Sequence, residues 1–324
     1  MERDFPLPCV CQKTPPFPSV FKSPKSYNTI NGLSKAINEG LTIGTEVAIL
    51  EFGASHKHDI DKLIRFIKPD IALVTNVLPQ HLETFKCVEN IMEEKFKLLK
   101  SSDVAILNTD IIDTILPDKI KKVTIGSKRN VDYKIENCIV DENGCAFKIN
   151  GVSFVSSLVG KCNCENLLLS ISTCLFLGID IKRLALSVKN LKSVENRLEI
   201  KDIKYQDKNI KIINDSFNSN IKGFTNALEV MSFYKGKKVI ITPGIVEGGK
   251  RRAELNGFIA KKIMETKTDV YLIESNVTKY YIDDFVKRGY DYTLFTSFVE
   301  SFTKAKENYD VILVENDISD IYKY

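Results

Sequence analysis

Short apolar runs alternate with amphipathic stretches from about residue 30 onward. In the first half of the chain the apolar runs predict strands at residues 46–52, 71–75 and 103–108. The stretches between them have a helical period and predict helices at residues 58–67 and 87–100. Strands that alternate with helices favour right-handed βαβ crossovers and a mostly parallel sheet.

The pattern changes between about residues 120 and 157. Turn sequences at residues 142–144 and 150–151 separate β-rich segments there, which predicts an antiparallel flap on the edge of the sheet. Two helices are expected next. Residues 163–177 are apolar on nearly all sides, which predicts a buried helix that ends at Gly178, and residues 181–191 are amphipathic.

A junction near residues 192–198 opens a second alternating series. Its predicted strands are residues 210–214, 237–242, 269–273 and 310–314, and its predicted helices are residues 222–233, 251–266, 279–288 and 298–308. This series predicts a smaller, Rossmann-like doubly wound domain. We therefore expect an irregular segment over residues 1–22, an α/β domain over residues 23–193 and a second α/β domain over residues 194–324.

The composition is typical of a soluble globular protein, with 44% hydrophobic and 27% charged residues. The net charge of +4 comes from 46 basic and 42 acidic residues without a basic block, so nucleic acid is not indicated as a partner. No apolar run reaches the roughly 18 residues that span a bilayer. The proline-rich start does not resemble a signal peptide, which favours a cytoplasmic location.

All eight cysteines lie before residue 175. Their spacing fits neither a paired C-x-x-C zinc site nor a compact disulfide framework. The C-x-C pairs Cys9 with Cys11 and Cys162 with Cys164 leave a soft-metal site open as an alternative, although no histidine accompanies them. Reduced thiols are the favoured interpretation in a cytoplasmic protein.

Polar side chains follow the predicted strands, at the edge where open parallel sheets bind ligands. Glu51 follows the first strand, Asn76 ends the second, and His81 comes five residues later. Lys95 lies on the next predicted helix. A carboxylate and an imidazole at adjacent strand ends suit Mg²⁺ beside a phosphate. Helix capping and surface roles explain the same residues, and spacing alone leaves both interpretations open.

A series of segments, in this order, resembles the Mur ligase family. They are SPKSYNT (23–29), EFGASHKHDI (51–60), TNVLPQHLETF (75–85), EEKFKLL (93–99), GKCNCENLLLSISTCLFLGI (160–179), ENRLE (195–199), NDSFNSN (214–220) and TPGIVEGGK (242–250). The resemblance covers residues 23 to about 315. It departs from the family at Cys162, where these ligases have a histidine.

Members of this family use ATP to join an amino acid or peptide to a carboxylate through an acyl phosphate, in peptidoglycan precursor synthesis for the cell wall. The motifs are most similar to the branch that adds D-alanyl-D-alanine to a UDP-muramyl tripeptide; the folylpolyglutamate synthetase branch stays an alternative. The resemblance implies a P-loop-NTPase-like central domain followed by a Rossmann-like domain.

The resemblance also implies the following roles. Glu51, His81 and Lys95, the lysine that the family carbamylates, would be catalytic and would hold Mg²⁺. ATP would be bound by Asn76, Asn163, Asn166, Arg197 and Asp215. The amino acid or dipeptide substrate would be bound by Ser216, Asn218 and Glu247.

The glycine-rich phosphate loop of the family, G-x-x-G-K-[ST], has no counterpart in this sequence. The 22 residues ahead of Ser23 contain five prolines and no glycine. Three explanations stay open: a fragment of a longer ligase, a diverged nucleotide-binding module, or a separate chain that supplies the loop and the UDP-binding domain. Because the loop provides several phosphate contacts, we expect little activity from this chain alone.

Overall fold

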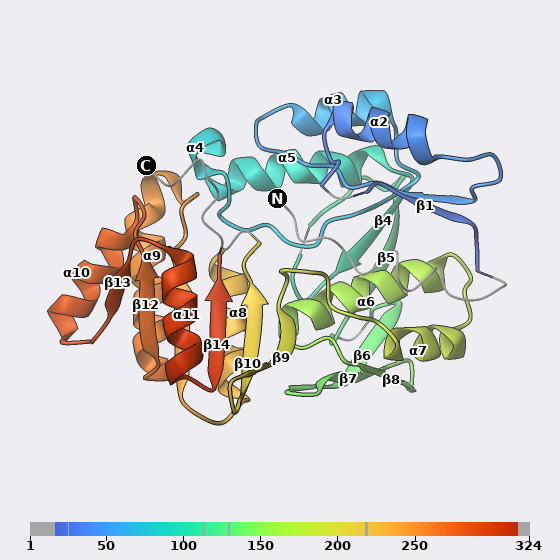
Figure 1. The fold of residues 1–324 in the computed structure, drawn as a ribbon. Coiled ribbons are helices and arrows are strands. Elements are labelled where there is room, and N and C mark those ends of the chain that lie inside the picture. Colours follow the sequence, from blue (N-terminus) through green and yellow to red (C-terminus); the bar gives the residue numbers. More distant parts are fainter. Residues whose placement is uncertain (1–16, 25, 113, 129, 218–219, 317–324) are drawn as a thin grey trace. The chain divides into compact units, whose positions relative to one another are not determined.

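A six-stranded sheet organises the first of two units in the computed structural model, which describes residues 17–24, 26–112, 114–128, 130–217 and 220–316. The first unit comprises Met1–Val77 and Cys87–Lys192, and the second comprises Leu78–Lys86 and Ser193–Tyr324 (Figure 1). The short segment 78–86 therefore lies with the second unit, although it falls inside the range predicted for the first domain.

The sheet of the first unit has the strand order β3-β4-β5-β6-β7-β8. The strands are β3 (Ile71–Leu73), β4 (Val104–Asn108), β5 (Lys121–Gly126), β6 (Tyr133–Asp141), β7 (Gly144–Ile149) and β8 (Val152–Ser156). The first four pair in parallel, and β7 and β8 continue the sheet antiparallel. This arrangement confirms the mostly parallel sheet. The antiparallel flap starts one strand later than predicted, because β5 pairs in parallel with β4.

Helices α5 (Val88–Ser101), α6 (Lys161–Phe176) and α7 (Ile181–Lys189) complete this part of the first unit. The apolar sides of α6 explain its burial, since Leu167, Leu169 and Ile171 pack with Ile125 and Phe147 of the sheet in one hydrophobic core. At about 25 cal/mol per Å² of apolar surface, this burial is the main stabilising contribution of α6.

Two short strands lie outside the six-stranded sheet. β1 (Val20–Lys22) pairs in parallel with β2 (Val47–Ile49), so the expected irregularity of residues 1–22 is wrong at residues 20–22. Strands of three residues show no readable alternation, which is why the pattern missed β1. Helices α2 (Ile30–Gly40), which the pattern also missed, and α3 (Asp59–Phe66) accompany these strands.

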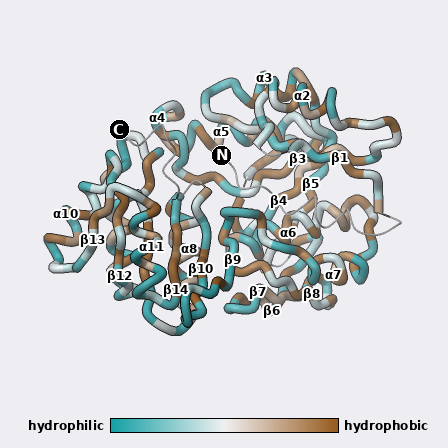
Figure 2. The backbone as a smooth tube through the Cα atoms, viewed as in Figure 1, coloured by the Kyte–Doolittle hydropathy of each residue, from teal (hydrophilic) through white to brown (hydrophobic). Residues whose placement is uncertain are grey.

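The sheet of the second unit has the order β13-β12-β11-β14-β10-β9. Its strands are β9 (Glu199–Tyr205), β10 (Lys208–Asp215), β11 (Lys238–Thr242), β12 (Asp269–Ile273), β13 (Thr293–Phe295) and β14 (Val311–Glu315). All pair in parallel except β9, which confirms the Rossmann-like expectation. Figure 2 shows the hydrophobic course of β14, which is buried along its whole length.

The helices of the second unit are α4 (Leu82–Phe85), α8 (Ile221–Ser232), the 3₁₀ turn η1 (Gly249–Arg251), α9 (Arg252–Thr266), α10 (Thr278–Arg288) and α11 (Phe298–Asn308). Because β14 returns between β10 and β11, the carboxyl ends of these three strands lie side by side. Ligands of open α/β sheets bind at such an edge. Across the described part of the chain, no helix is both long enough and apolar enough to cross a membrane.

Candidate functional site

Glu51 follows β2, and Asn28 fixes its carboxylate. Asn28 Nδ2 donates to Glu51 Oε1 at 2.8 Å, and the Gly53 N–H donates to the Asn28 carbonyl at 2.9 Å. Glycine permits this approach, because a Cβ at position 53 would lie 2.6 Å from Asn28 Cγ. The SYNT (26–29) and EFGA (51–54) segments thus form one strand-end structure. Asn28 was missed as a site residue, although the SYNT motif contained it.

Lys95 of α5 reaches the end of strand β3, which belongs to the six-stranded sheet. Its Nζ donates to the Asn76 carbonyl at 3.3 Å, and Asn76 Oδ1 accepts the Val77 N–H at 3.1 Å. Lys95 and Asn76 are half-buried. The structure therefore brings together two residues predicted for the site. An ammonium donates hydrogen bonds and cannot bind a cation, whereas a carbamate at this nitrogen would offer oxygen ligands of the kind that Mg²⁺ prefers.

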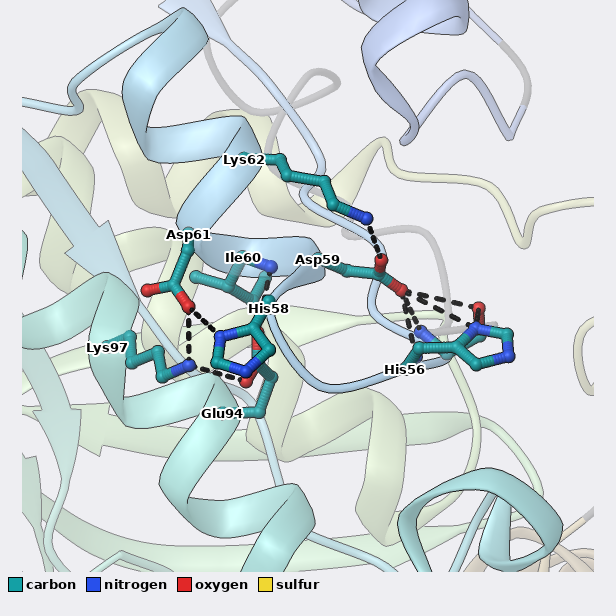
Figure 3. A network of polar contacts seen from close by, with 9 residues as sticks. His56, His58, Asp59, Ile60, Asp61, Lys62, Glu94 and Lys97 are labelled. Atoms are coloured by element: carbon teal, nitrogen blue, oxygen red, sulfur yellow. Dashed lines mark hydrogen bonds and ion pairs between the residues drawn. The ribbon is translucent and has the colours of Figure 1, made fainter.

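The residues next to Lys95 hold α5 against α3 (Figure 3). Glu94 is only 2% exposed, and its Oε1 accepts the Ile60 N–H in the first turn of α3 at 2.9 Å. Lys97 Nζ lies 2.8 Å from Glu94 Oε2 and 2.7 Å from Asp61 Oδ2. A carboxylate at a helix N-terminus is favoured by the helix dipole. The network therefore fixes the helix that carries Lys95.

The charges of this network shift its pKa values. The hydrogen bond from Lys97, followed by that from His58, lowers the pKa of Asp61. Burial by itself lowers the pKa of Lys97, but the hydrogen bonds and charges of Asp61 and Glu94 outweigh it and raise that pKa. Both shifts favour the charged forms, so the ion pair is fully formed near neutral pH.

Asn163 and Asn166 lie in the first two turns of α6, three residues apart and therefore on neighbouring positions of one helix face. Asn163 Nδ2 donates to the Val159 carbonyl at 2.9 Å. Both asparagines are half-buried, in contrast to the buried Cys162 and Cys164 beside them. Their nucleotide-binding role stays a prediction.

In the second unit, the ENRLE and NDSF segments interlock. Arg197 is only 7% exposed, and its Cζ lies 4.1 Å from the centre of the Phe217 ring. The buried Asp215, at the end of β10, accepts the Leu198 N–H at 2.9 Å. Asn196 has a φ of 60° and Leu198 a φ of 49°. Left-handed backbone at a leucine is strained, so the surrounding contacts must hold this turn in place.

Ser216 continues this strand end, and its N–H donates to Asn214 Oδ1 at 3.2 Å. Asn214 Nδ2 in turn donates to Asn196 Oδ1 at 2.8 Å, which connects the strand end to the ENRLE turn. The predicted substrate residue Asn218 lies outside the described residues.

His81 meets Glu247 in the second unit, with 3.5 Å between Nδ1 and Oε2. Glu51 and Lys95, with which His81 was predicted to hold Mg²⁺, belong to the first unit. Within the described ranges, no group of three or more His, Cys, Asp or Glu side chains is arranged to hold a metal ion. The metal set therefore stays a prediction, one that depends on carbamylation of Lys95.

A buried polar cluster supports the loop that carries Glu247, and the sequence pattern did not predict it. Asn256 Oδ1 accepts the Ile245 N–H at 2.8 Å, and its Nδ2 donates to the Ile245 carbonyl at 2.9 Å. Tyr281 and Glu315 are fully buried beside this loop. Burial, and then the nearby charge of Glu315, raise the pKa of Tyr281 well above its usual range.

Comparison with known proteins gives consistent matches. Residues 10–174 match the family model of the Mur ligase middle domain. The chain is 29% identical over 239 residues to UDP-N-acetylmuramoyl-tripeptide–D-alanyl-D-alanine ligase of Bacillus subtilis (strain 168), covering 71% of this chain and 51% of that protein. It thus spans about half the length of the curated relatives it matches.

Two solved structures share the fold. MurF from Acinetobacter baumannii superposes with a TM-score of 0.79 at 15% identity, covering 96% of this chain and 69% of that one. MurF ligase from Thermotoga maritima in complex with ADP superposes with a TM-score of 0.78 at 22% identity, covering 92% and 70%.

Proposed function

Because this chain belongs to the Mur ligase family, we propose that it carries the catalytic and C-terminal parts of an ATP-dependent ligase of peptidoglycan precursor synthesis. The ligase would join an amino acid, or D-alanyl-D-alanine as in the Bacillus subtilis relative, to the carboxylate of a UDP-muramyl peptide. The ADP held by the Thermotoga maritima structure supports ATP as the energy source.

The proposal rests on one observation: polar side chains are held at the ends of two strands of the first unit, β2 and β3. Glu51 is held by Asn28 behind β2, and Lys95 reaches Asn76 behind β3. A carboxylate and a lysine that follow strands of an α/β unit are residue types that suit an anionic phosphate with its cation. The contacts of Glu94 with Ile60 and of Lys97 with Asp61 hold α5, the helix that carries Lys95, against α3.

The donor types of the predicted metal residues suit Mg²⁺ on one condition. The Glu51 carboxylate is a hard oxygen ligand, and Lys95 becomes one only as a carbamate. Glu51, carbamylated Lys95 and His81 would hold the ion, which supplies charge neutralisation for phosphoryl transfer. Asn76, Asn163, Asn166, Arg197 and Asp215 would bind ATP. Ser216, Asn218 and Glu247 would bind the amino substrate.

The proposed reaction has two steps. An oxygen of the acceptor carboxylate attacks the γ-phosphorus of ATP, the bond to the β-phosphate oxygen breaks, and ADP leaves an acyl phosphate. The substrate amine then attacks the acyl carbon, loses its proton, and releases phosphate as the amide forms. Arg197, whose Cζ lies 4.1 Å from the centre of the Phe217 ring, would stabilise the charge that moves between the phosphate oxygens.

A nucleotide-binding module without turnover is the second function that the sequence analysis left open. No G-x-x-G-K-[ST] segment occurs in the 324 residues. Without that loop, the chain could bind a nucleotide without turning it over, or could take the loop from a separate chain.

The test measures binding and turnover separately. Calorimetry gives ATP affinity with and without Mg²⁺, and ADP release is followed with a UDP-muramyl tripeptide plus D-alanyl-D-alanine. ADP release coupled to a new amide, identified by mass, supports the ligase. Binding that needs Mg²⁺ without turnover supports the nucleotide-binding module, and absence of ATP binding contradicts both.

A further inference from the structure

Three cysteines meet on the helix-facing side of the flap in the first unit. Strand β6 contains a bulge, because Glu136 pairs with Lys148 while Ile139 pairs with Ala146. Asn137, with a φ of 52°, and Cys138 therefore share the space opposite one residue of β7. The extra residue reverses the side-chain alternation and turns Cys138 toward α6.

Packing on either side of the bulge supports this reversal. Ile135 and Val140 are five residues apart, an odd spacing that would place them on opposite faces of a regular strand. Both nevertheless pack against the same hydrophobic core as α6. Cys138 is two residues from Val140 and lies on that same face.

The sulfur atoms of Cys138 and Cys164 are 3.1 Å apart. Cys164 is 3% exposed in the first turn of α6, whereas Cys138 is exposed to solvent. Cys145, also 3% exposed, hydrogen-bonds Cys164 from β7. An accessible thiol thus stands in contact with a buried one, at a separation only about 1 Å longer than a disulfide bond.

The electrostatic surroundings give the two thiols different reactivity. The hydrogen bond from Cys164 lowers the pKa of Cys138 from 9.0 to about 7, although partial burial opposes the shift. The charge of Lys161 contributes in the same direction, and Glu165 opposes it. Hydrogen bonds with Cys138 and Cys145, together with burial, raise the pKa of Cys164. Cys138 is therefore the nucleophile of the pair.

We propose that Cys138 and Cys164 are a thiol pair that a peroxide oxidises reversibly to a disulfide. The Cys138 thiolate attacks one peroxide oxygen, the O–O bond breaks, and the sulfur becomes a sulfenic acid while hydroxide leaves and takes up a proton. The Cys164 sulfur then attacks the Cys138 sulfur and the S–O bond breaks. The second hydroxide leaves with the Cys164 proton as water. Two thiols and one peroxide give one disulfide and two waters.

The disulfide has a consequence for α6, and this part rests on the proposed function. Formation of the bond shortens the sulfur separation by about 1 Å and draws the first turn of α6 toward β6. Asn163 and Asn166, the proposed nucleotide residues, lie on either side of Cys164. We expect ATP affinity to fall about five-fold, the effect of stretching one hydrogen bond beyond its range.

The experiment treats the reduced full chain with hydrogen peroxide, alkylates the remaining thiols and digests with trypsin and Glu-C. These proteases place Cys138 in residues 137–142, separate from Cys145, and Cys164 in residues 162–165. We expect these two peptides to be cross-linked, and to separate after dithiothreitol. The cross-link should persist in Cys162→Ser and Cys87→Ser and vanish in Cys138→Ser. A cross-link elsewhere, or oxidised Cys138 without a cross-link, overturns the proposal.

A second measurement separates this proposal from the proposed function. ATP affinity is compared between reduced and oxidised wild type and Cys138→Ser, whose exposed site tolerates serine. If oxidation lowers the ATP affinity of the wild type but not that of Cys138→Ser, the disulfide controls the nucleotide site. Equal affinities overturn that control. If reduced protein binds no ATP, the proposed function fails, and the peptide map still decides the thiol pair.

Discussion

The proposed metal role of Lys95 depends on the chemistry of a single nitrogen atom. With carbon-13 bicarbonate, we expect a carbamate signal in the NMR spectrum that Lys95→Ala abolishes. The variant should also lose turnover by about 100-fold, the effect of removing one transition-state contact, with partial recovery in acetate. Lys100→Ala, on the exposed side of the same helix, is the control and should retain both. A carbamate signal or full activity in Lys95→Ala would contradict the metal role.

Gly244 tests how tightly the loop that carries Glu247 is packed. Its φ is 89°, and an added Cβ would lie 2.7 Å from Tyr281 Cε2 and 2.9 Å from Asn256 Oδ1. Gly289 also has a left-handed φ, of 62°, but open space around it. We expect Gly289→Ala to lower the free energy of unfolding of the second unit by roughly 1 kcal/mol and Gly244→Ala by roughly 3 kcal/mol. If urea denaturation gave equal losses of unfolding free energy for the two variants, the loop would be able to move and accommodate the added Cβ.

The sequence predicted site residues that follow strands, but it missed residues whose role depends on contacts with residues far away along the chain. Lys95 and Asn76 were recognised because strand ends and motif order are local features, and the structure joins them. Asn28 binds Glu51 from 23 residues away, and Asn256 holds Ile245 from 11 residues away. The periodicity of hydrophobic residues cannot predict such contacts, because the residues come together only when the chain folds.

At the scale of elements, the ion pair between α3 and α5 predicts a pH dependence. The pKa of Asp61 is lowered in the folded state, so its contribution to stability is present above the ordinary value of 3.8. It is lost as pH falls through the lower folded value. Asp61→Asn should therefore lower the urea stability of the first unit near pH 6, and the difference from wild type should vanish in acid.

The control for this ion pair is Asp118→Asn, a change at an exposed carboxylate. Its urea stability should fall with decreasing pH as that of the wild type does. A deficit in Asp61→Asn that persists unchanged to about pH 2 would show that packing, and not charge, stabilises this helix pair.

Elements long enough to show a full hydrophobic pattern were predicted well. Elements that form through pairing with another strand, or that are very short, were not. Strand β12 and helix α11 begin and end where the pattern placed them. Strand β9 lies between the predicted junction and the first predicted strand of the second series, where the pattern predicted no element. It forms because it pairs antiparallel with β10 across a turn at Gln206, where φ is 54°. Strands β1 and β13 have three residues each, too few for an alternation to appear.

At the scale of the whole molecule, the chain passes between its two units three times. It enters the second unit for residues 78–86, returns to the first, and enters the second again after Lys192. Three contacts hold the segment there: Gly249 against Leu82 and Glu83, Arg252 near Glu83, and His81 with Glu247. The alternation of strands and helices predicts the boundary between the two domains. It does not predict that residues 78–86 join the second unit, because their helix α4 has only four residues and shows no readable pattern.

Gly249 is the position that tests this excursion. With a φ of 52°, an added Cβ would lie 2.9 Å from the Glu83 nitrogen and 3.0 Å from the Leu82 carbonyl carbon, both backbone atoms that cannot turn aside. Gly249→Ala should therefore release α4 and raise hydrogen exchange of the amides of residues 84–86 about ten-fold. Gly178→Ala, in the first unit with a φ of 82° and open space, should not. Unchanged exchange in Gly249→Ala would mean that the segment is held by side-chain contacts that outweigh this one. Release of residues 78–86 would also move His81 away from Glu247. Loss of turnover in Gly249→Ala would therefore show that the proposed reaction needs this segment in place.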